Sequence, residues 1–149
     1  MLDKTAILVV DDRQDDVELL RLMFKRSRIL NPIKTVGSVN DAICYLKGEG
    51  IFADRKTYPF PGLLLLDLHL PDGSGFDVLR WIKAQPTPLP LAVIVLTGSD
   101  VAAIGWAYDL GAESFLIKPL RFQDFENMIT KPRGLKLTST PDGCLLEWK

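Results

Sequence analysis

Three aspartates directly follow runs of apolar residues, where strands of a sheet would end. Asp11 and Asp12 follow residues 6–10, and Asp67 follows residues 63–66. If these strands lie side by side, the carboxylates form a dense cluster of negative charge, which is costly unless a cation relieves it. A hard divalent ion does so, and Mg²⁺ in particular binds through one or two carboxylates while keeping several waters. The acidic residues therefore predict a Mg²⁺ site.

Two further polar residues stand at the same kind of position. Thr97 follows residues 92–96, and Lys118 follows residues 114–117. A lysine supplies a point charge for phosphoryl oxygens, and a threonine hydroxyl can hydrogen-bond one of them. Phosphoryl transfer needs mainly positioning and charge neutralisation, and a carboxylate such as Asp67 can act as the nucleophile and form an acyl phosphate.

Each of these residues has an ordinary structural explanation when it is considered alone. An aspartate pair commonly caps a helix or a turn, a threonine can cap a strand end, and a lysine before a proline is commonly solvated. The combination is far more specific, because every member ends an apolar run. We therefore expect the whole set to act together in phosphoryl transfer.

The apolar runs themselves predict the fold. A strand that is buried on both faces reads as a continuous apolar run, which is typical of a parallel sheet covered by helices. Residues 33–36 form a weaker run, which fits an edge strand. Segments of helical period separate the runs, and in the first of them Val17, Leu20 and Phe24 share one face. This alternation predicts a doubly wound α/β sheet of five strands with helices on both faces, whose working site lies beyond the carboxyl ends of the strands.

Two segments do not fit a minimal sheet of this kind. Residues 48–62 form a long connection, which we interpret as a surface insertion packed by its own aromatic residues, although long loops are also often functional. Residues 132–149 contain the turn sequence Thr-Pro-Asp-Gly at 140–143 and predict a β-hairpin in which Gly143 adopts a positive φ. One face of this hairpin carries Leu135, Leu137, Ser139, Cys144, Leu146 and Trp148. An isolated hairpin is marginal in water, so we expect it to pack on its own domain or against a second subunit, with a disordered tail as the remaining alternative.

The composition fits a single globular domain with no bias toward nucleic acid or anionic lipid. The chain has 149 residues, 47% of them apolar, and a net charge of −1. Cys44 and Cys144 match neither a disulfide framework nor a zinc spacing, and they fit a reducing cytosol. The N-terminus has no signal-like apolar run, and no apolar stretch is long enough to cross a bilayer. We therefore expect a cytoplasmic protein that has neither a membrane nor a nucleic acid as its partner.

Four short motifs resemble those of response-regulator receiver domains from bacterial two-component systems. They are Val-Val-Asp-Asp at 9–12, Leu-Leu-Asp-Leu-His-Leu-Pro at 65–71, Val-Leu-Thr-Gly at 95–98 and Lys-Pro at 118–119. The resemblance covers about residues 5–130, and we expect a receiver domain over residues 1–131 and a hairpin extension over 132–149. The long connection before Gly62 and the phrase around Asp67 are most similar to stand-alone regulators that serve bacterial phytochrome-type kinases.

This resemblance implies a flavodoxin-like strand order, 2-1-3-4-5, and a set of metal ligands. Asp67 is expected to be the phosphoacceptor. Asp12 and Asp67 are expected to bind Mg²⁺ directly, and Asp11 is expected to bind it through a water molecule. The backbone carbonyl of His69 is expected to complete the protein ligands.

The resemblance also implies roles for residues around the phosphoacceptor. Thr97 and Lys118 are expected to contact the phosphoryl group and so to share the catalytic work. Thr97 and Phe115 are expected to form the switch. Many receivers have tyrosine at the position of Phe115, so we expect ring burial here in place of a phenolic hydrogen bond. The side chains of His69 and Ser99 are expected to tune hydrolysis of the acyl phosphate.

The implied function is that of a single-domain response regulator. In a Mg²⁺-dependent reaction, Asp67 would take a phosphoryl group from the phosphohistidine of a sensor histidine kinase, phytochrome-type by the nearest resemblance, or of a phosphotransfer protein. The chain would not be an enzyme that acts on a separate substrate, although it would catalyse its own phosphorylation and dephosphorylation. The stretch after the fifth helical segment is too short for a helix-turn-helix domain, so we expect output by protein contact, homodimerisation or phosphorelay.

Three other classes of protein share part of this pattern. A haloacid-dehalogenase-like phosphatase requires a second aspartate two residues after its nucleophile, where this chain has His69, and the sequence has no cap domain. A flavodoxin-like FMN protein shares the sheet order, but no loop rich in serine, threonine and glycine follows the first strand here. A degenerate receiver that only binds a partner would be expected to lack some of the acidic residues, and this chain lacks none.

Overall fold

The fold is built around one parallel sheet. The computed structural model describes residues 5–98, 101–129 and 134–148. Its main sheet has five strands in the order β2-β1-β3-β6-β7, and every neighbouring pair is parallel. These strands are β1 (Ala6–Val10), β2 (Ile33–Val36), β3 (Pro61–Asp67), β6 (Ala92–Thr97) and β7 (Ser114–Ile117). The predicted strand order 2-1-3-4-5 is confirmed, because β6 and β7 are the fourth and fifth strands of this sheet along the chain.

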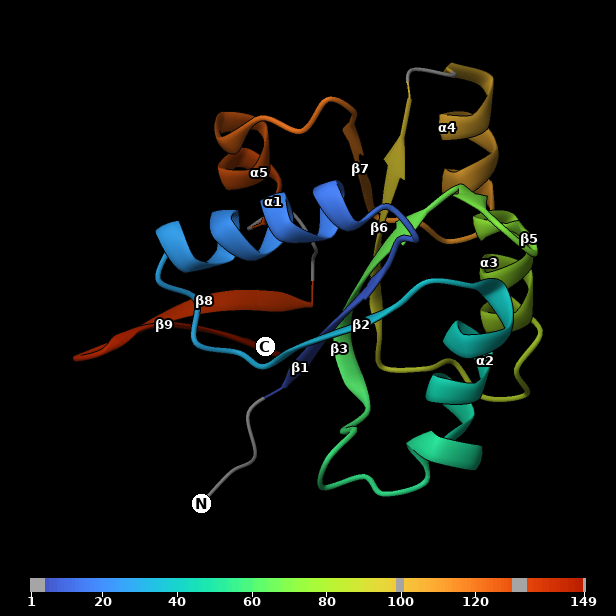
Figure 1. Ribbon diagram of the computed structural model, residues 1–149, viewed down its shortest axis with the longest axis horizontal. Coiled ribbons are helices and arrows are strands. Elements are labelled where there is room, and N and C mark those ends of the chain that lie inside the picture. The colour runs from blue at the N-terminus through green and yellow to red at the C-terminus, as the bar shows by residue number, and fades with distance from the viewer. Residues whose placement is uncertain (1–4, 99–100, 130–133, 149) are drawn as a thin grey trace.

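Helices cover both faces of the sheet (Figure 1). They are α1 (Gln14–Arg26), α2 (Val39–Lys47), α3 (Gly75–Lys83), α4 (Val101–Asp109) and α5 (Phe122–Ile129). One core lies on the side of α1 and α5, and a second core lies on the side of α2, α3 and α4. Successive strand residues enter opposite cores, as the pleat requires, so that Ile7 belongs to the first core and Leu8 to the second. None of the helices in the described ranges is long and apolar enough to cross a membrane.

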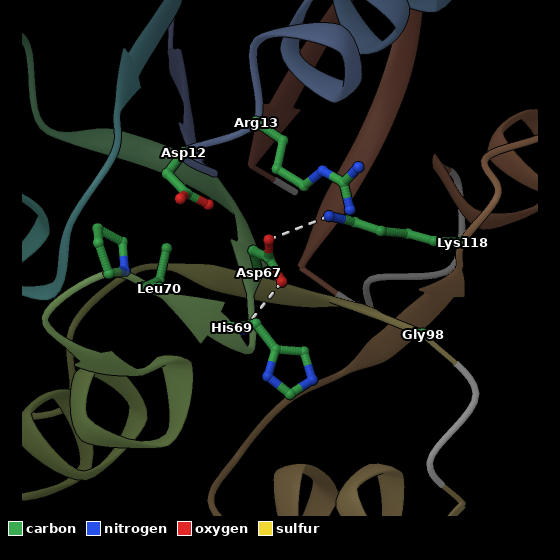
Figure 2. A pocket seen from close by; sticks show the side chains of 8 residues that line it. Asp12, Arg13, Asp67, His69, Leu70, Gly98 and Lys118 are labelled. Atoms are coloured by element: carbon green, nitrogen blue, oxygen red, sulfur yellow. Dashed lines mark hydrogen bonds and ion pairs between the residues drawn. The ribbon is translucent and has the colours of Figure 1, made fainter.

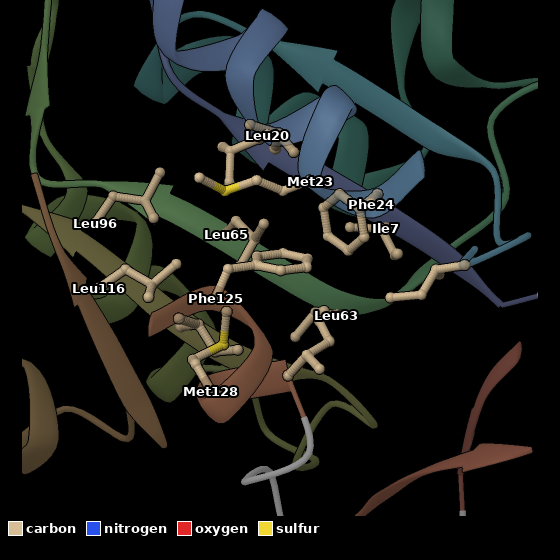
Figure 3. Close-up of a cluster of buried hydrophobic side chains, with 14 of the residues drawn as sticks. Ile7, Leu20, Met23, Phe24, Leu63, Leu65, Leu96, Leu116, Phe125 and Met128 are labelled. Carbon is tan, nitrogen blue, oxygen red and sulfur yellow. The ribbon is translucent and has the colours of Figure 1, made fainter. Parts of the chain in front are cut away.

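The core on the α1 side is closed by aromatic rings (Figure 3). Phe24 of α1 and Phe125 of α5 are fully buried and meet edge to face, with ring centroids 4.8 Å apart. Val17 and Leu20 are buried in the same core, which confirms the helical face predicted from their spacing with Phe24. Burial of a side chain of this size stabilises a fold by about 1.5–3 kcal/mol, so these contacts tie α1 and α5 to the central strands.

The loop after β3 contains a small hairpin that the sequence analysis did not predict. Its strands are β4 (His69–Leu70) and β5 (Gly73–Ser74), which pair antiparallel. The hydroxyl of Ser74 accepts a hydrogen bond from the backbone N–H of Phe76, and the carboxylate of Asp77 accepts one from the N–H of Ser74. This capping box starts α3 and holds the end of the loop that follows Asp67.

The insertion at residues 48–62 is packed by its own aromatic residues, which confirms the structural interpretation of this segment. Phe52, at the end of a short 3₁₀ helix (Gly50–Phe52), contacts the rings of Tyr45 and Tyr58 at centroid distances of 5.1 and 5.2 Å. Arg55, which the sequence analysis did not single out, donates hydrogen bonds to the carbonyls of Tyr45 and Leu46 at 2.8 Å each. These carbonyls belong to the last turn of α2, where the C-cap residue Gly48 also donates its N–H to the carbonyl of Tyr45 at 3.1 Å, so Arg55 fastens the insertion to the end of that helix.

The C-terminal segment forms the predicted hairpin, from β8 (Leu135–Thr140) and β9 (Gly143–Trp148). Leu135 pairs with Trp148 and Leu137 with Leu146, so the predicted apolar face is present. Leu135 and Leu146 are buried in the core on the α1 side. The prediction of a positive φ at Gly143 is wrong. Glycine is needed there for space, because a Cβ atom would collide with the carbonyl oxygen of Arg28.

The hairpin packs on its own receiver through the buried side chain of Asn31. The amide of Asn31 donates hydrogen bonds to the carbonyls of Thr5 at 2.7 Å and Leu146 at 2.9 Å, and its oxygen accepts one from the N–H of Leu146 at 2.8 Å. The N–H of Leu30 donates to the carbonyl of Cys144 at 2.8 Å, and the N–H of Cys144 donates to the carbonyl of Arg28 at 2.7 Å, which adds to this contact. Thr5 and Asn31 precede β1 and β2, so the hairpin covers the amino ends of the strands and leaves their carboxyl ends open (Figure 1).

Replacement of Asn31 by alanine is expected to destabilise the fold by about 1–3 kcal/mol, because the buried N–H and carbonyl of Leu146 lose their partners. Thermal and urea unfolding of the purified variant measure this loss. Asn40→Ala is the matched control, since Asn40 is exposed and should change the free energy of unfolding by less than about 0.5 kcal/mol. Equal losses in the two variants would show that Asn31 does not anchor the hairpin.

Candidate functional site

The polar residues predicted at the strand ends come together at the carboxyl edge of the sheet. Asp11 directly follows β1, and its N–H donates to the carbonyl of Val36 at 3.0 Å. Asp67 and Thr97 are the last residues of β3 and β6. Lys118 directly follows β7, and its N–H donates to the carbonyl of Thr97 at 2.7 Å. The parallel register therefore brings these side chains to one edge, although the residues are far apart in the sequence.

Asp11, Asp12 and Asp67 form a compact acidic cluster. Each offers a carboxylate oxygen, and these oxygens all lie within 4.8 Å of one another. Asp11 and Asp67 are buried, whereas Asp12 is exposed at the mouth of the site. One oxygen of Asp11 accepts the N–H of Arg13 at 2.9 Å. A set of carboxylate oxygens this close together fits a hard divalent cation, which prefers oxygen ligands.

Lys118 lies beside this cluster and supplies its positive charge. Its Nζ donates to Asp11 Oδ2 at 3.0 Å, to Asp67 Oδ2 at 3.0 Å and to Asp16 Oδ2 at 2.7 Å. Burial alone would lower the pKa of Lys118, but the hydrogen bonds to the three carboxylates outweigh it and raise this pKa above its ordinary value. Burial raises the pKa of Asp11, and hydrogen bonds from Arg13 and Lys118 offset this rise only in part. Lys118 is therefore a permanent cation at the site.

Thr97 presents a hydroxyl whose hydrogen-bonding capacity is unused. The residue is 1% exposed, and within the described ranges its Oγ1 has no hydrogen-bond partner. A buried polar atom without a partner costs about 1–3 kcal/mol, so such atoms commonly mark the place of a ligand or water. The hydroxyl of Thr97 can therefore donate to an oxygen atom of a group bound at the end of β6.

A cavity of about 430 Å³ opens over these residues. Figure 2 shows Asp67 at its centre, with Lys118 on one side and Asp12 on the other. The lining residues are Asp12, Arg13, Asp67, His69, Leu70, Pro71, Gly98 and Lys118. The N–H of His69 donates to Asp67 Oδ1 at 3.0 Å, which orients the carboxylate in the cavity. The cavity has room for a phosphoryl group above Asp67.

One predicted residue, Phe115, lies away from this cavity. Phe115 is half-buried in β7, and its ring meets that of Tyr108 edge to face at a centroid distance of 6.1 Å. It also borders a groove of about 330 Å³ between α4, β7 and α5, away from the acidic cluster. Ser99 lies outside the described residues.

Arg13 and Asp16 belong to the site but were not predicted from the sequence. Arg13 lines the cavity, and Asp16 makes the shortest contact to Lys118. The position of Asp16 held a signal, since it lies four residues after Asp12, where the first helical turn begins. Its partner Lys118 lies 102 residues away, and the spacing of Asp16 alone does not identify that partner.

Comparison with known proteins agrees with this geometry. The profile of the response regulator receiver domain matches residues 7–130 of the chain. Response regulator Rcp1 from Synechocystis is 32% identical over 128 residues, which cover 83% of each protein. Other relatives are longer, and the chain spans 24% and 53% of two of them.

Solved structures of similar proteins share the fold of this chain. Bacteriophytochrome response regulator RtBRR has a TM-score of 0.83 at 29% identity, over 94% of this chain and 84% of that one. The phosphorylated cyanobacterial phytochrome response regulator RcpA has a TM-score of 0.72 at 32% identity, over 83% and 88%. The Mn²⁺-bound form of Rcp1 has a TM-score of 0.70 at 30% identity, over the same shares. The sheet order, the acidic strand ends and the profile match together show that this chain belongs to the response regulator receiver domain family.

Proposed function

We propose that Asp67 of this chain accepts a phosphoryl group from the phosphohistidine of a sensor histidine kinase or of a phosphotransfer protein. The observation that carries this proposal is the position of Asp67, which lines an open cavity and has Lys118 Nζ 3.0 Å from one of its oxygens. Relatives named as bacteriophytochrome and phytochrome response regulators support a phytochrome-type kinase as the donor. A phosphotransfer protein would present the same chemical group.

The residues of the cavity suit an in-line transfer. The Asp67 carboxylate attacks the phosphorus, a P–O bond forms as the P–N bond breaks, and the bonding electron pair stays with the imidazole nitrogen of the donor. Lys118 offers its charge to one phosphoryl oxygen, and Thr97 donates its hydroxyl to another. A bound divalent ion would neutralise part of the charge on the phosphoryl oxygens.

We propose that this ion is Mg²⁺ and that the three aspartates of the acidic cluster differ in how they bind it. Asp11 and Asp67 each have one oxygen that accepts a backbone N–H and one that accepts Lys118, so these contacts do not separate their roles. We propose from the family resemblance that Asp11 acts through a water molecule. Asp12 is exposed and has no side-chain hydrogen bond within the described ranges, so its carboxylate is available as a direct ligand together with Asp67. The backbone carbonyl of His69 is the proposed remaining protein ligand. We propose that the side chain of His69, which lines the cavity, tunes hydrolysis of the acyl phosphate, and we propose the same role for Ser99.

The switch that we propose joins Thr97 to Phe115. A phosphoryl group on Asp67 favours the state in which Thr97 moves toward it, because only that state makes the extra hydrogen bond. The Phe115 ring then enters the space that Thr97 leaves, and the groove between α4, β7 and α5 changes shape. Output follows from this surface by protein contact, homodimerisation or onward phosphotransfer, with no separate substrate turned over.

Asp67→Asn is expected to abolish Mg²⁺-dependent phosphorylation by acetyl phosphate, because the amide cannot act as the nucleophile. Intact-protein mass spectrometry measures phosphate uptake directly. Asp54→Asn, which changes a fully exposed aspartate elsewhere, should take up phosphate as the wild type does. Equal uptake in Asp67→Asn and the wild type would rule out Asp67 as the acceptor.

Asp12→Ala is expected to weaken Mg²⁺ binding more than Asp11→Ala does. Loss of a water-mediated partner costs about tenfold in metal affinity, whereas loss of a direct carboxylate costs more than that. Calorimetric titration of the two variants and the wild type compares the dissociation constants. The reverse order would exchange the proposed roles of the two aspartates.

Phosphorylation is expected to move Phe115 into a second environment. Selective ¹³C labelling of phenylalanine, followed by NMR with and without the acyl-phosphate mimic beryllofluoride, reports this change. In Thr97→Ala the mimic should still bind, but the Phe115 signal should shift much less. An unchanged Phe115 signal in the wild-type complex would contradict the proposed switch.

A further inference from the structure

The shortest ion pair at the site involves a residue outside the receiver motifs. Asp16 Oδ2 lies 2.7 Å from Lys118 Nζ, whereas the oxygens of Asp11 and Asp67 are both 3.0 Å from it. Asp16 belongs to the first turn of α1, and its side chain is 20% exposed, so the pair is largely shielded from solvent. Arg13 adds a weaker contact, with its Nε 3.9 Å from the same Asp16 oxygen.

Asp16 differs from the other two carboxylate partners of Lys118, because its carboxylate is not part of the proposed metal site. An ammonium group has three N–H donors, and Lys118 divides them among three carboxylates. Asp11 and Asp67 also belong to the acidic cluster, whose oxygens converge within 4.8 Å. Asp16 is not a member of that cluster, so its charge is not shared between Lys118 and an ion bound there.

Lys118 and a divalent ion would therefore compete for the charge of Asp11 and Asp67. Two cations that share the same anions at short range repel each other, and the repulsion is strong where solvent screening is weak. Without another carboxylate to hold it, Lys118 would either weaken ion binding or move away from the position beside Asp67 in which it can contact the phosphoryl oxygens. A carboxylate in the first turn of a helix is favoured by the helix dipole, so Asp16 is well placed to be a fixed anion there.

We propose that Asp16 is a positioning residue that holds Lys118 beside Asp67 while a divalent ion occupies the acidic cluster. Because Asp16 neutralises the charge of Lys118, the oxygens of Asp11 and Asp67 are free to bind the ion, and ion binding becomes stronger. The same contact keeps Lys118 in position to bind the phosphoryl group. This inference rests on the proposed function, since it concerns the same metal and phosphoryl site. It adds Asp16, a residue of α1, to the site residues that lie at the ends of the strands.

Asp15 provides a matched control for the test. It is the neighbouring residue in the same helical turn and carries the same charge, but it is exposed and makes no hydrogen bond or ion pair within the described ranges. Asp15→Asn therefore removes a charge near the site without touching Lys118. Any general effect of charge on ion binding appears in this variant, and the specific effect of the Lys118 contact appears only in Asp16→Asn.

The experiment is a Mn²⁺ titration of the full chain, followed by electron paramagnetic resonance of the free ion. Asp16→Asn is expected to raise the dissociation constant about tenfold, as the loss of an outer-sphere partner does. Asp15→Asn is expected to change it by less than about twofold, because exposed charges are largely screened at physiological salt. Asp16→Glu keeps the charge and should restore most of the affinity.

A double-mutant cycle with Lys118→Met separates positioning from simple charge. Without the lysine there is no competing cation, so Asp16→Asn should then change Mn²⁺ affinity no more than Asp15→Asn does. Circular dichroism and thermal melting confirm that each variant is folded before titration. The same variants should show slower phosphate uptake from acetyl phosphate in Asp16→Asn and unchanged uptake in Asp15→Asn.

The outcomes distinguish this inference from the proposed function. If the wild type binds Mn²⁺ but Asp16→Asn behaves as Asp15→Asn does, or if its effect persists in the Lys118→Met background, the positioning role of Asp16 is refuted and the proposed function stands. If the wild type binds no divalent ion, the metal chemistry of the proposed function fails and this inference fails with it.

Discussion

The burial of two carboxylates beside one lysine is the interaction on which this site depends. Asp11 and Asp67 lie almost completely out of solvent at the carboxyl edge of the sheet. Isolated buried charges cost several kcal/mol each, so such a pair is tolerated only with a cation close by. Lys118 meets this need at 3.0 Å from both carboxylates. The site is therefore held together by the balance between these two carboxylates and the Lys118 ammonium group.

This balance places a strict demand on the sheet. Asp11, Asp67 and Lys118 come from the ends of three different strands, and β6 lies between β3 and β7. Apolar side chains on both faces of each strand fix the register, since a slip of one residue would exchange the two cores. The hydrogen bond from the N–H of Lys118 to the carbonyl of Thr97 then sets where the lysine leaves the sheet. Core packing thus determines the geometry of the charges.

The two additions to the minimal fold leave the charged edge free. The C-terminal hairpin packs at the amino ends of the strands through Asn31 and shares the core on the α1 side. The insertion after α2 is held by Arg55 and by a cluster of aromatic rings. Both are fastened by contacts that do not involve the acidic cluster. Both additions therefore leave the acidic cluster unobstructed.

Much of this architecture was determined by local sequence. Continuous apolar runs specify strands that are buried on both faces, and polar residues at their ends identify the working edge. The turn sequence at 140–143 and the alternation around it specify the hairpin. Those features depend on residues that are close in the sequence. The sequence therefore correctly predicted that Asp11, Asp67, Thr97 and Lys118 lie at strand ends on one edge of the sheet.

Tertiary structure alone decided the remaining features. Asp16 meets Lys118 across 102 residues, and the Asn31 amide meets Leu146 across 115. Glycine is required at 143 because the carbonyl oxygen of Arg28 leaves no room for a Cβ atom. The local turn pattern predicted a positive φ there, which is a different reason for a glycine. Such contacts depend on the angle at which two segments pack and on the direction of single side chains. A one-dimensional pattern does not encode those quantities, because they arise only when the whole core is assembled.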